Sequence, residues 1–345
     1  MYLFVSITAL LASTQGVYAG FNPSSMQNIA VYWGQNSYGA GSGSLAQQRL
    51  SYYCANTNIN IIPLAFLTAF NGQGGQPTMN FANAGDNCTV FSGTQTFNCP
   101  QLAQDIQTCQ STYGKTILLS IGGATYTEGG FSSSSAAVSE ANLIWATFGP
   151  QQSGSSALRP FGSSAVDGFD FDFEATVNNV APFANQLRSL MSANTQSSGR
   201  EWYLTAAPQC PYPDAADNQM LNGAVAFDAV FVQFYNNYCG SQSFVAGATT
   251  QNNFNFATWD NWAKTVSKNP AVKVFLGVPA STTAAGSGYE SPANLLPVIK
   301  YCKQFSSFGG VMMWDASQTI ANSGFLSGVA SDLAAPASRI MRWMA

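Results

Sequence analysis

Histidine is absent from this chain of 345 residues. Its absence excludes Ser-His-Asp and Cys-His catalytic mechanisms, zinc motifs that contain histidine, and histidine general bases. Thiolate metal sites are not favoured either, because the seven cysteines are irregularly spaced and form no CxxC pair. Carboxylates are therefore the obvious groups for acid–base chemistry, and the sequence predicts neither a metal nor a cofactor.

Charge is also scarce. Charged residues make up 8% of the chain, the formal net charge is −4, and no basic run is present. Nucleic acid is therefore not an expected partner, whereas a neutral, polar substrate is. No oligomer interface can be identified from the sequence, so a monomer is the default expectation.

The N-terminus carries the features of a secretory signal. An apolar stretch from Tyr2 to Ala12 is followed by small residues that end in Val17-Tyr18-Ala19, which is typical of a cleavage site, although no Lys or Arg precedes it. Polar residues interrupt this stretch, and a membrane span needs about 20 apolar residues. We therefore predict a signal peptide over residues 1–19, a mature chain over residues 20–345, no membrane anchor and an extracellular location, in which residence in a cell wall is left open.

Export favours disulfide bonds, and an odd number of cysteines leaves at least one thiol outside any intramolecular bridge. Sequence proximity favours Cys88 with Cys99 and Cys210 with Cys239. Cys54 could then pair with Cys109, which leaves Cys302 as a buried small hydrophobe.

The run Asp167-Gly168-Phe169-Asp170-Phe171-Asp172-Phe173-Glu174 holds four of the 16 acidic residues of the chain. In a strand, Asp170, Asp172 and Glu174 lie on one face and the three phenylalanines on the other. A solvated strand face would mix charge signs, and a calcium loop would have polar residues between its acids and a glycine at its sixth position. Three adjoining acids without a basic neighbour point instead to catalysis, whereas Asp167 is interpreted as a turn residue.

Eight apolar runs have the length of strands, and amphipathic stretches lie between most of them. The runs are Ile29–Tyr32, Ile61–Phe66, Thr116–Ile121, Val166–Phe173, Trp202–Ala207, Ala229–Phe234, Val272–Gly277 and Gly310–Trp314, and the amphipathic stretches include Ala137–Phe148, Val180–Ala193, Trp259–Val266 and Pro292–Phe305. This alternation predicts an α/β fold, a single (β/α)8 or TIM barrel. The phenylalanines of the acidic run then face the helices, the acids line the interior, and Glu174 lies at the carboxyl end, where barrel enzymes keep their active sites.

The chain resembles family 18 glycoside hydrolases, specifically class III, plant- and fungal-type chitinases. The matching segments are Tyr32–Asn36, Ser120–Gly123, Asp167–Glu174, Tyr203–Pro211, Val232–Asn237 and Gly309–Trp314, which span nearly the whole mature chain in order. The resemblance implies a barrel that hydrolyses β-1,4 links between N-acetylglucosamine units of chitin or chitooligosaccharides. By the same resemblance, configuration would be retained, and the nucleophile would be the acetamido carbonyl of the substrate.

The resemblance also implies residue roles. Glu174 would be the general acid, Asp172 would orient the acetamido group, Tyr235 would donate to its carbonyl, and Asp170 would share a proton or hydrogen bond with Asp172. Trp314 would form the floor under the scissile sugar. The other positions that match the family around the cleft are Tyr32, Gln35, Phe66, Asn80, Gln233 and Ala280.

About thirty residues separate Val278 from Gly309, too few for the additional α+β domain of larger family members. We therefore expect an open groove and endo-type cleavage. Two alternatives remain. One is a catalytically silent lectin or glycosidase inhibitor on the same barrel, which the presence of Glu174 disfavours. The other is an endo-β-N-acetylglucosaminidase, which shares the acidic run.

Overall fold

The computed structural model describes residues 20–336, so the predicted signal peptide lies outside the described residues. Eight parallel strands form a closed barrel, since β1 pairs with both β2 and β11. The strands are β1 (Asn28–Val31), β2 (Ile61–Ala69), β6 (Thr116–Gly122), β7 (Gly168–Asp172), β8 (Tyr203–Ala206), β9 (Ala229–Gln233), β10 (Lys273–Pro279) and β11 (Phe308–Trp314). All eight predicted strands are therefore confirmed.

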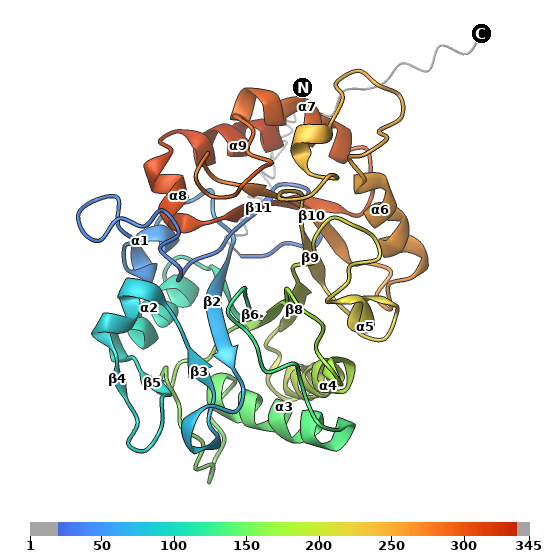
Figure 1. The fold of residues 1–345 in the computed structure, drawn as a ribbon. Coiled ribbons are helices and arrows are strands. Elements are labelled where there is room, and N and C mark those ends of the chain that lie inside the picture. The colour runs from blue at the N-terminus through green and yellow to red at the C-terminus, as the bar shows by residue number, and fades with distance from the viewer. Residues whose placement is uncertain (1–19, 337–345) are drawn as a thin grey trace, which may run out of the picture.

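Helices surround the barrel (Figure 1). They are α1 (Leu50–Cys54), α2 (Pro100–Ser111), α3 (Ser134–Phe148), α4 (Val180–Ser198), α5 (Asn218–Leu221), α6 (Phe256–Thr265), α7 (Pro292–Cys302), α8 (Ala316–Ala321) and α9 (Phe325–Ala334). The short strand β3 (Thr78–Met79) pairs antiparallel with β2, and β4 (Thr89–Val90) with β5 (Phe97–Asn98) forms a small hairpin. Between β10 and β11 the chain forms only loops and α7, so the predicted absence of an insertion domain is confirmed.

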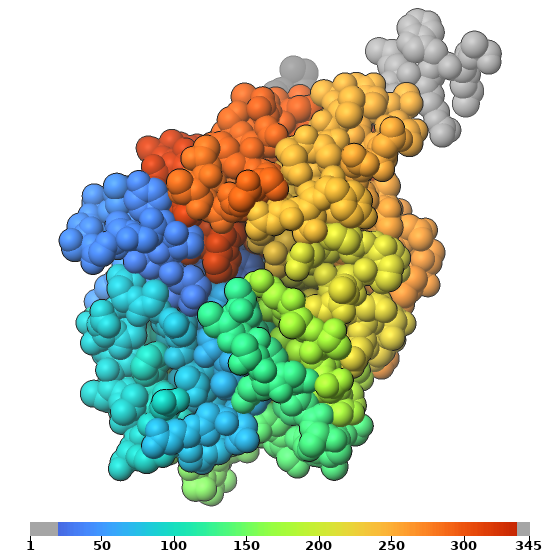
Figure 2. Space-filling view, in the orientation of Figure 1, coloured from blue at the N-terminus to red at the C-terminus, as the bar shows by residue number. Residues whose placement is uncertain are grey.

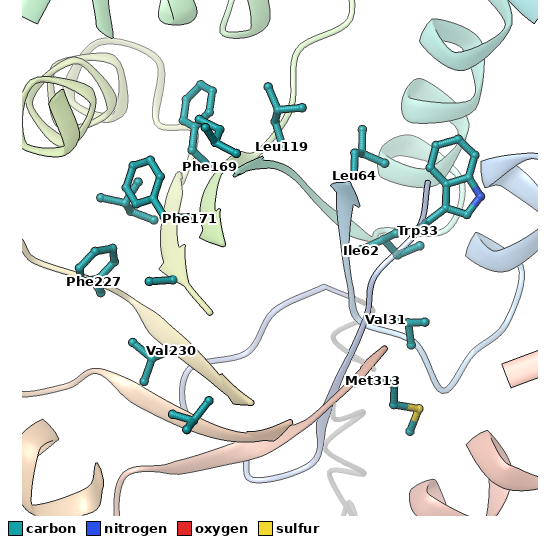
Figure 3. Packing of buried hydrophobic residues seen from close by; sticks show 14 of the residues in the cluster. Val31, Trp33, Ile62, Leu64, Leu119, Phe169, Phe171, Phe227, Val230 and Met313 are labelled. Carbon is teal, nitrogen blue, oxygen red and sulfur yellow. The ribbon is translucent and has the colours of Figure 1, made fainter. Parts of the chain in front are cut away.

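The strands are largely apolar on both faces, as parallel strands covered by helices require, and polar residues such as Asp170 are confined to the inner face. Phe169 and Phe171 of β7 are fully buried. Their rings contact Trp145 of α3 and Phe183 of α4, with centroids 6.4 and 6.0 Å apart. Figure 3 shows both phenylalanines pointing away from the barrel axis. The alternation within β7 therefore places Asp170 and Asp172 inside the barrel.

All three expected disulfides are present. Cys54 is bonded to Cys109, Cys88 to Cys99 and Cys210 to Cys239, while Cys302 is free and buried. The bond between Cys210 and Cys239 joins the loops that follow β8 and β9. Within residues 20–336, no helix is both long and apolar enough to cross a membrane.

Candidate active site

Asp170 lies inside the barrel and is completely buried. Its carboxyl oxygens accept three hydroxyl hydrogen bonds, from Tyr32 at 2.7 Å, Ser120 at 2.7 Å and Thr205 at 2.6 Å. Tyr32 directly follows β1, and the other two donors lie on β6 and β8, the two neighbours of β7. Asp170 therefore connects four regions of the barrel wall. The expected shared proton or hydrogen bond between Asp170 and Asp172 stays a prediction.

Asp172 ends β7 one step nearer to the carboxyl face of the barrel. Its Oδ1 accepts a hydrogen bond of 2.8 Å from Nε2 of Gln233, which also donates to the carbonyl of Ala207 at 2.9 Å. The second contact fixes the Gln233 amide with its nitrogen toward the carboxylate. Gln233 therefore holds Asp172 in one orientation.

Gly122, the last residue of β6, and Gly123 after it let this strand end closely against β7. The N–H of Gly123 donates to the Asp172 carbonyl at 2.7 Å. Gly123 has φ of +77°, and a Cβ there would lie 2.6 Å from the ring of Phe66. Only glycine combines this conformation with this approach. The glycines of the Ser-x-Gly-Gly motif are therefore needed to bring Asp172 beside the aromatic floor of the site.

A cavity of about 370 Å³ opens at the carboxyl ends of the strands, and it brings five of the predicted site residues together. These are Asp172, Glu174, Gln233, Tyr235 and Trp314. Glu174 is exposed, whereas Tyr235 is only 8% exposed. Figure 2 shows the central hollow of this face. An exposed acid thus stands beside an oriented carboxyl and a phenolic hydroxyl.

Aromatic rings form the floor of the site. The ring of Trp314, at the end of β11, stacks on Phe66 with centroids 5.9 Å apart and an interplanar angle of 20°. Tyr32 lies 5.7 Å from the Trp314 ring and reaches Asp170 with its hydroxyl. Tyr32 and Phe66 support the floor from behind, since neither lines the cavity.

Three other predicted residues also lie outside the cavity lining. Gln35 donates to the carbonyls of Ala65 and Asn80, at 2.8 and 3.0 Å, so its amide connects the loop after β1 to β2 and β3. Asn80 is exposed beside it. Ala280 is completely buried, and its N–H donates to the Trp314 carbonyl at 2.8 Å.

Four residues line the cavity that were not predicted as site residues: Ala124, Gln209, Asn236 and Ala284. Each lies in a loop that follows a barrel strand. Gln209 and Asn236 follow the apolar runs that form β8 and β9. Their position in a turn directly after a predicted strand was the signal that could have identified them. The Gln209 side chain accepts a 2.8 Å hydrogen bond from Asn237, next to the disulfide between Cys210 and Cys239. This contact and the disulfide stiffen the rim.

Burial is the first cause of every pKa shift among the acidic groups of the site. It raises the pKa of Asp170 and Glu174, and it raises the pKa of Asp172 well above its usual range, with further contributions from the charges of Glu174 and Asp170. Burial and the charge of Asp172 raise the pKa of Tyr235, so its hydroxyl keeps its proton. The raised pKa values favour the protonated forms of both groups, so Glu174 can donate a proton and Tyr235 can donate a hydrogen bond.

These shifts predict that the protein is more stable at mildly acidic pH than at alkaline pH. A carboxyl with a raised pKa binds more protons in the folded state than in the unfolded state, so stability is lost as pH rises through the raised pKa. Glu140, on α3, contributes in the same direction, since burial and the charge of Glu128 raise its pKa to about 7. Thermal unfolding at constant ionic strength should give a midpoint several degrees higher at pH 5 than at pH 8. The Glu140→Gln variant should show a smaller fall between pH 5 and pH 7, and a midpoint that climbs steadily with pH would contradict the prediction.

No group of three or more Cys, Asp or Glu side chains placed to hold a metal ion is found in residues 20–336.

Comparisons with known sequences agree on a single family. The family model for glycosyl hydrolases family 18 matches residues 28–288. A class III chitinase of Arthroderma benhamiae is 52% identical over 98% of this chain and 95% of its own length. Endochitinase 33 of Trichoderma harzianum is 53% identical over 95% of this chain and 98% of its own length.

Solved structures also align with the described fold. The chitinase ICChI from Ipomoea carnea is 32% identical, with a TM-score of 0.68 over 88% of this chain and 99% of its own. The xylanase and alpha-amylase inhibitor protein XAIP-II from Scadoxus multiflorus is 31% identical, also with a TM-score of 0.68, over 88% of this chain and 98% of its own. At this similarity, chitinases and inhibitors share one barrel, so the site residues must separate the two functions.

Proposed function

The chain belongs to glycosyl hydrolases family 18, and from this premise we propose that it is an endochitinase, which hydrolyses β-1,4 linkages between N-acetylglucosamine units. The observation that carries the proposal is identity of 52–53% over nearly the whole chain to proteins named class III chitinase and endochitinase. The protein is accordingly a glycosidase. Chitin and its oligomers are its substrates, and we expect it to act as a monomer.

Glu174 begins the reaction as general acid. Its side chain is exposed at the cavity, while the partial burial of its carboxyl raises its pKa, so it can remain protonated where an ordinary glutamate would be ionised. Its proton goes to the glycosidic oxygen as the bond from that oxygen to C1 breaks. The acetamido carbonyl oxygen of the same sugar forms a bond to C1, which gives an oxazolinium intermediate.

Asp172 and Tyr235 act on the acetamido group. Held by Gln233, Asp172 accepts the acetamido N–H and thereby points the carbonyl at C1. Tyr235 donates its hydroxyl to the carbonyl oxygen. A negative charge on Asp172 also stabilises the positive charge that develops on the ring. Asp170 acts one layer deeper, by fixing the position of β7 through its three hydrogen bonds from hydroxyls.

Water completes the reaction. Glu174, now a carboxylate, removes a proton from a water molecule whose oxygen attacks C1. The oxazolinium ring opens, the acetamido group is restored and Glu174 regains its proton. Because C1 is attacked twice from opposite faces, the product keeps the β configuration of the substrate.

The shape of the site supports cleavage within chains. The segment between β10 and β11 holds loops and α7 alone, so no additional domain closes the cavity on that side. A polymer can therefore lie across the site without threading an end into it. We also propose that residues 1–19 are removed on export and that the mature protein acts outside the cell, consistent with its three disulfides.

The residues that line the cavity favour an enzyme over the inhibitor or lectin alternative. An inhibitor or lectin needs no proton donor, whereas the cavity contains Glu174, Asp172 and Tyr235 together. An endo-β-N-acetylglucosaminidase would release glycans from a glycoprotein, and such release without chitin hydrolysis would replace the proposal.

The proposal is tested with a chitin hexamer followed by NMR. We expect internal cleavage into shorter products whose new reducing ends begin as β-anomers and then mutarotate. Initial α-anomers would refute the retaining mechanism. Successive release of dimers from one chain end would refute the endo mode, and an intact hexamer would refute the chitinase assignment.

A further inference from the structure

A second hollow of about 230 Å³ lies among the loops that follow the barrel strands. Its lining comes from the loop after β1, the loop after β10 and the end of α8. The lining residues with polar or aromatic side chains are Tyr38, Ser281, Thr282, Thr283, Tyr289 and Asn322. The volume is smaller than that of a typical pocket for a drug-sized ligand, so it suits one ring rather than a whole oligosaccharide.

One short segment separates this hollow from the catalytic cavity. Residues 281–283 line the hollow, and the next residue, Ala284, lines the catalytic cavity beside Trp314. The two spaces are therefore neighbours across a single loop. A chain that passes over Ala284 leaves one and enters the other.

The lining has the chemistry of a sugar site. It contains no Asp, Glu, Lys or Arg, so it offers nothing to a charged ligand. The Tyr289 hydroxyl accepts a 3.1 Å hydrogen bond from Asn322 Nδ2, which leaves the Tyr289 hydrogen to donate. Asn322 Nδ2 also donates to the Ala280 carbonyl at 2.9 Å. The Asn322 Oδ1 therefore remains as an acceptor, and Thr282 adds an exposed hydroxyl.

The hollow is also held rigid from behind. Ser281 and Thr283 both donate to Oε1 of Gln318, which is completely buried. Tyr289 packs on Phe325 with ring centroids 5.9 Å apart. Among the described residues, Gln318 Nε2 has no hydrogen-bond partner, and a buried donor without a partner is costly.

Tyr38 supplies the aromatic surface. Its backbone N–H is held by the Ser317 hydroxyl at 3.0 Å, while its side chain is 38% exposed. An exposed ring on a fixed backbone can cover the apolar face of a sugar with little loss of conformational freedom.

We propose that this hollow is an outer subsite that binds one N-acetylglucosamine unit of the chain whose scissile bond lies in the catalytic cavity. The proposal rests on the proposed chitinase function, and it assigns to Tyr38 and the segment 281–283 a role in the preference for longer chains. It concerns binding alone, since the hollow contains no acid that could cleave a bond.

The test measures affinity for chitin oligomers from dimer to hexamer by calorimetry in the Glu174→Gln background, where the ligand stays intact. Added Tyr38→Ala should weaken hexamer binding about five-fold, as expected for the loss of one aromatic contact, and the effect should shrink as the oligomer shortens. Tyr38→Phe keeps the ring and should restore most of the affinity. Thr282→Val should give a smaller loss with the same dependence on length, and Tyr52→Ala, at an exposed tyrosine on α1, is the matched control.

Equal weakening at every length, or none in Tyr38→Ala and Thr282→Val, would overturn the outer subsite. Failure of the chitinase function would look different. In that case the protein with an intact Glu174 would leave every oligomer uncleaved, whatever residue stood at position 38.

Discussion

Replacement of Glu174 by glutamine should reduce chitin hydrolysis by about 10²-fold to 10⁴-fold, the contribution typical of a positioned general acid. Glutamine keeps the size and polarity of the side chain but has no proton that it can transfer. Glu174 lies at the exposed mouth of the cavity and outside the network around Asp170. We therefore expect the variant to fold normally and to bind chitin oligomers. Initial rates on the hexamer, with unfolding curves and binding isotherms for the same preparations, make the measurement.

Asp172→Asn is the comparison for this variant. Asparagine retains a carbonyl oxygen that can accept the acetamido N–H but loses the negative charge, so the loss of rate should be smaller than for Glu174→Gln. Full activity in the glutamine variant would remove Glu174 from the role of acid. A larger loss in Asp172→Asn would transfer the main catalytic contribution to Asp172.

The second large effect is expected on stability. Asp170→Ala should lower the free energy of unfolding by about 3–5 kcal/mol, because it removes the acceptor of three buried hydroxyls and leaves a space inside the barrel. Tyr32, Ser120 and Thr205 would each lose their hydrogen bond. Urea unfolding followed by tryptophan fluorescence gives the measurement.

The matched variant is Asp170→Asn. It keeps one acceptor oxygen and the side-chain volume, and the hydroxyls can rotate to accept from its amide, so it should lose much less stability than Asp170→Ala. Ionised Asp170 also carries a cost of burial that both variants remove, as its raised pKa indicates. If both variants unfold at the same urea concentration, burial of the carboxyl matters more than its three hydrogen bonds.

The fold could be predicted closely because its signals are local. Eight apolar runs separated by amphipathic stretches specify parallel strands with helical connections, and the strict alternation of the acidic run sets which side chains of β7 face inward. Structure and prediction differ mainly at element ends. For example, β2 continues to Ala69, three residues beyond the predicted strand, where β3 pairs with it.

The site was only partly predictable. Asp172, Glu174, Gln233, Tyr235 and Trp314 follow strands or end them, and the closure of the barrel brings such ends together. Ala280 was expected at the cleft, but it is buried, and Ala284 in the same loop lines the cavity. A loop conformation depends on the neighbours that it packs against, and these are not adjacent in the sequence. The same limit applies to Asp170, whose three hydroxyl donors lie 35 to 138 residues away along the chain.

The sequence by itself determined the barrel, the inward carboxylates, the absence of histidine chemistry and the disulfides Cys88–Cys99 and Cys210–Cys239, because each depends on composition, periodicity or short spacing. Tertiary structure alone decided that Asp170 accepts hydrogen bonds from three hydroxyls, and that Gln233 orients Asp172. It also decided which loop residues line the cavity and that a second polar hollow lies beside it. Each of these depends on distances between segments far apart in the chain, which only the closure of the barrel and the packing of its loops bring within reach.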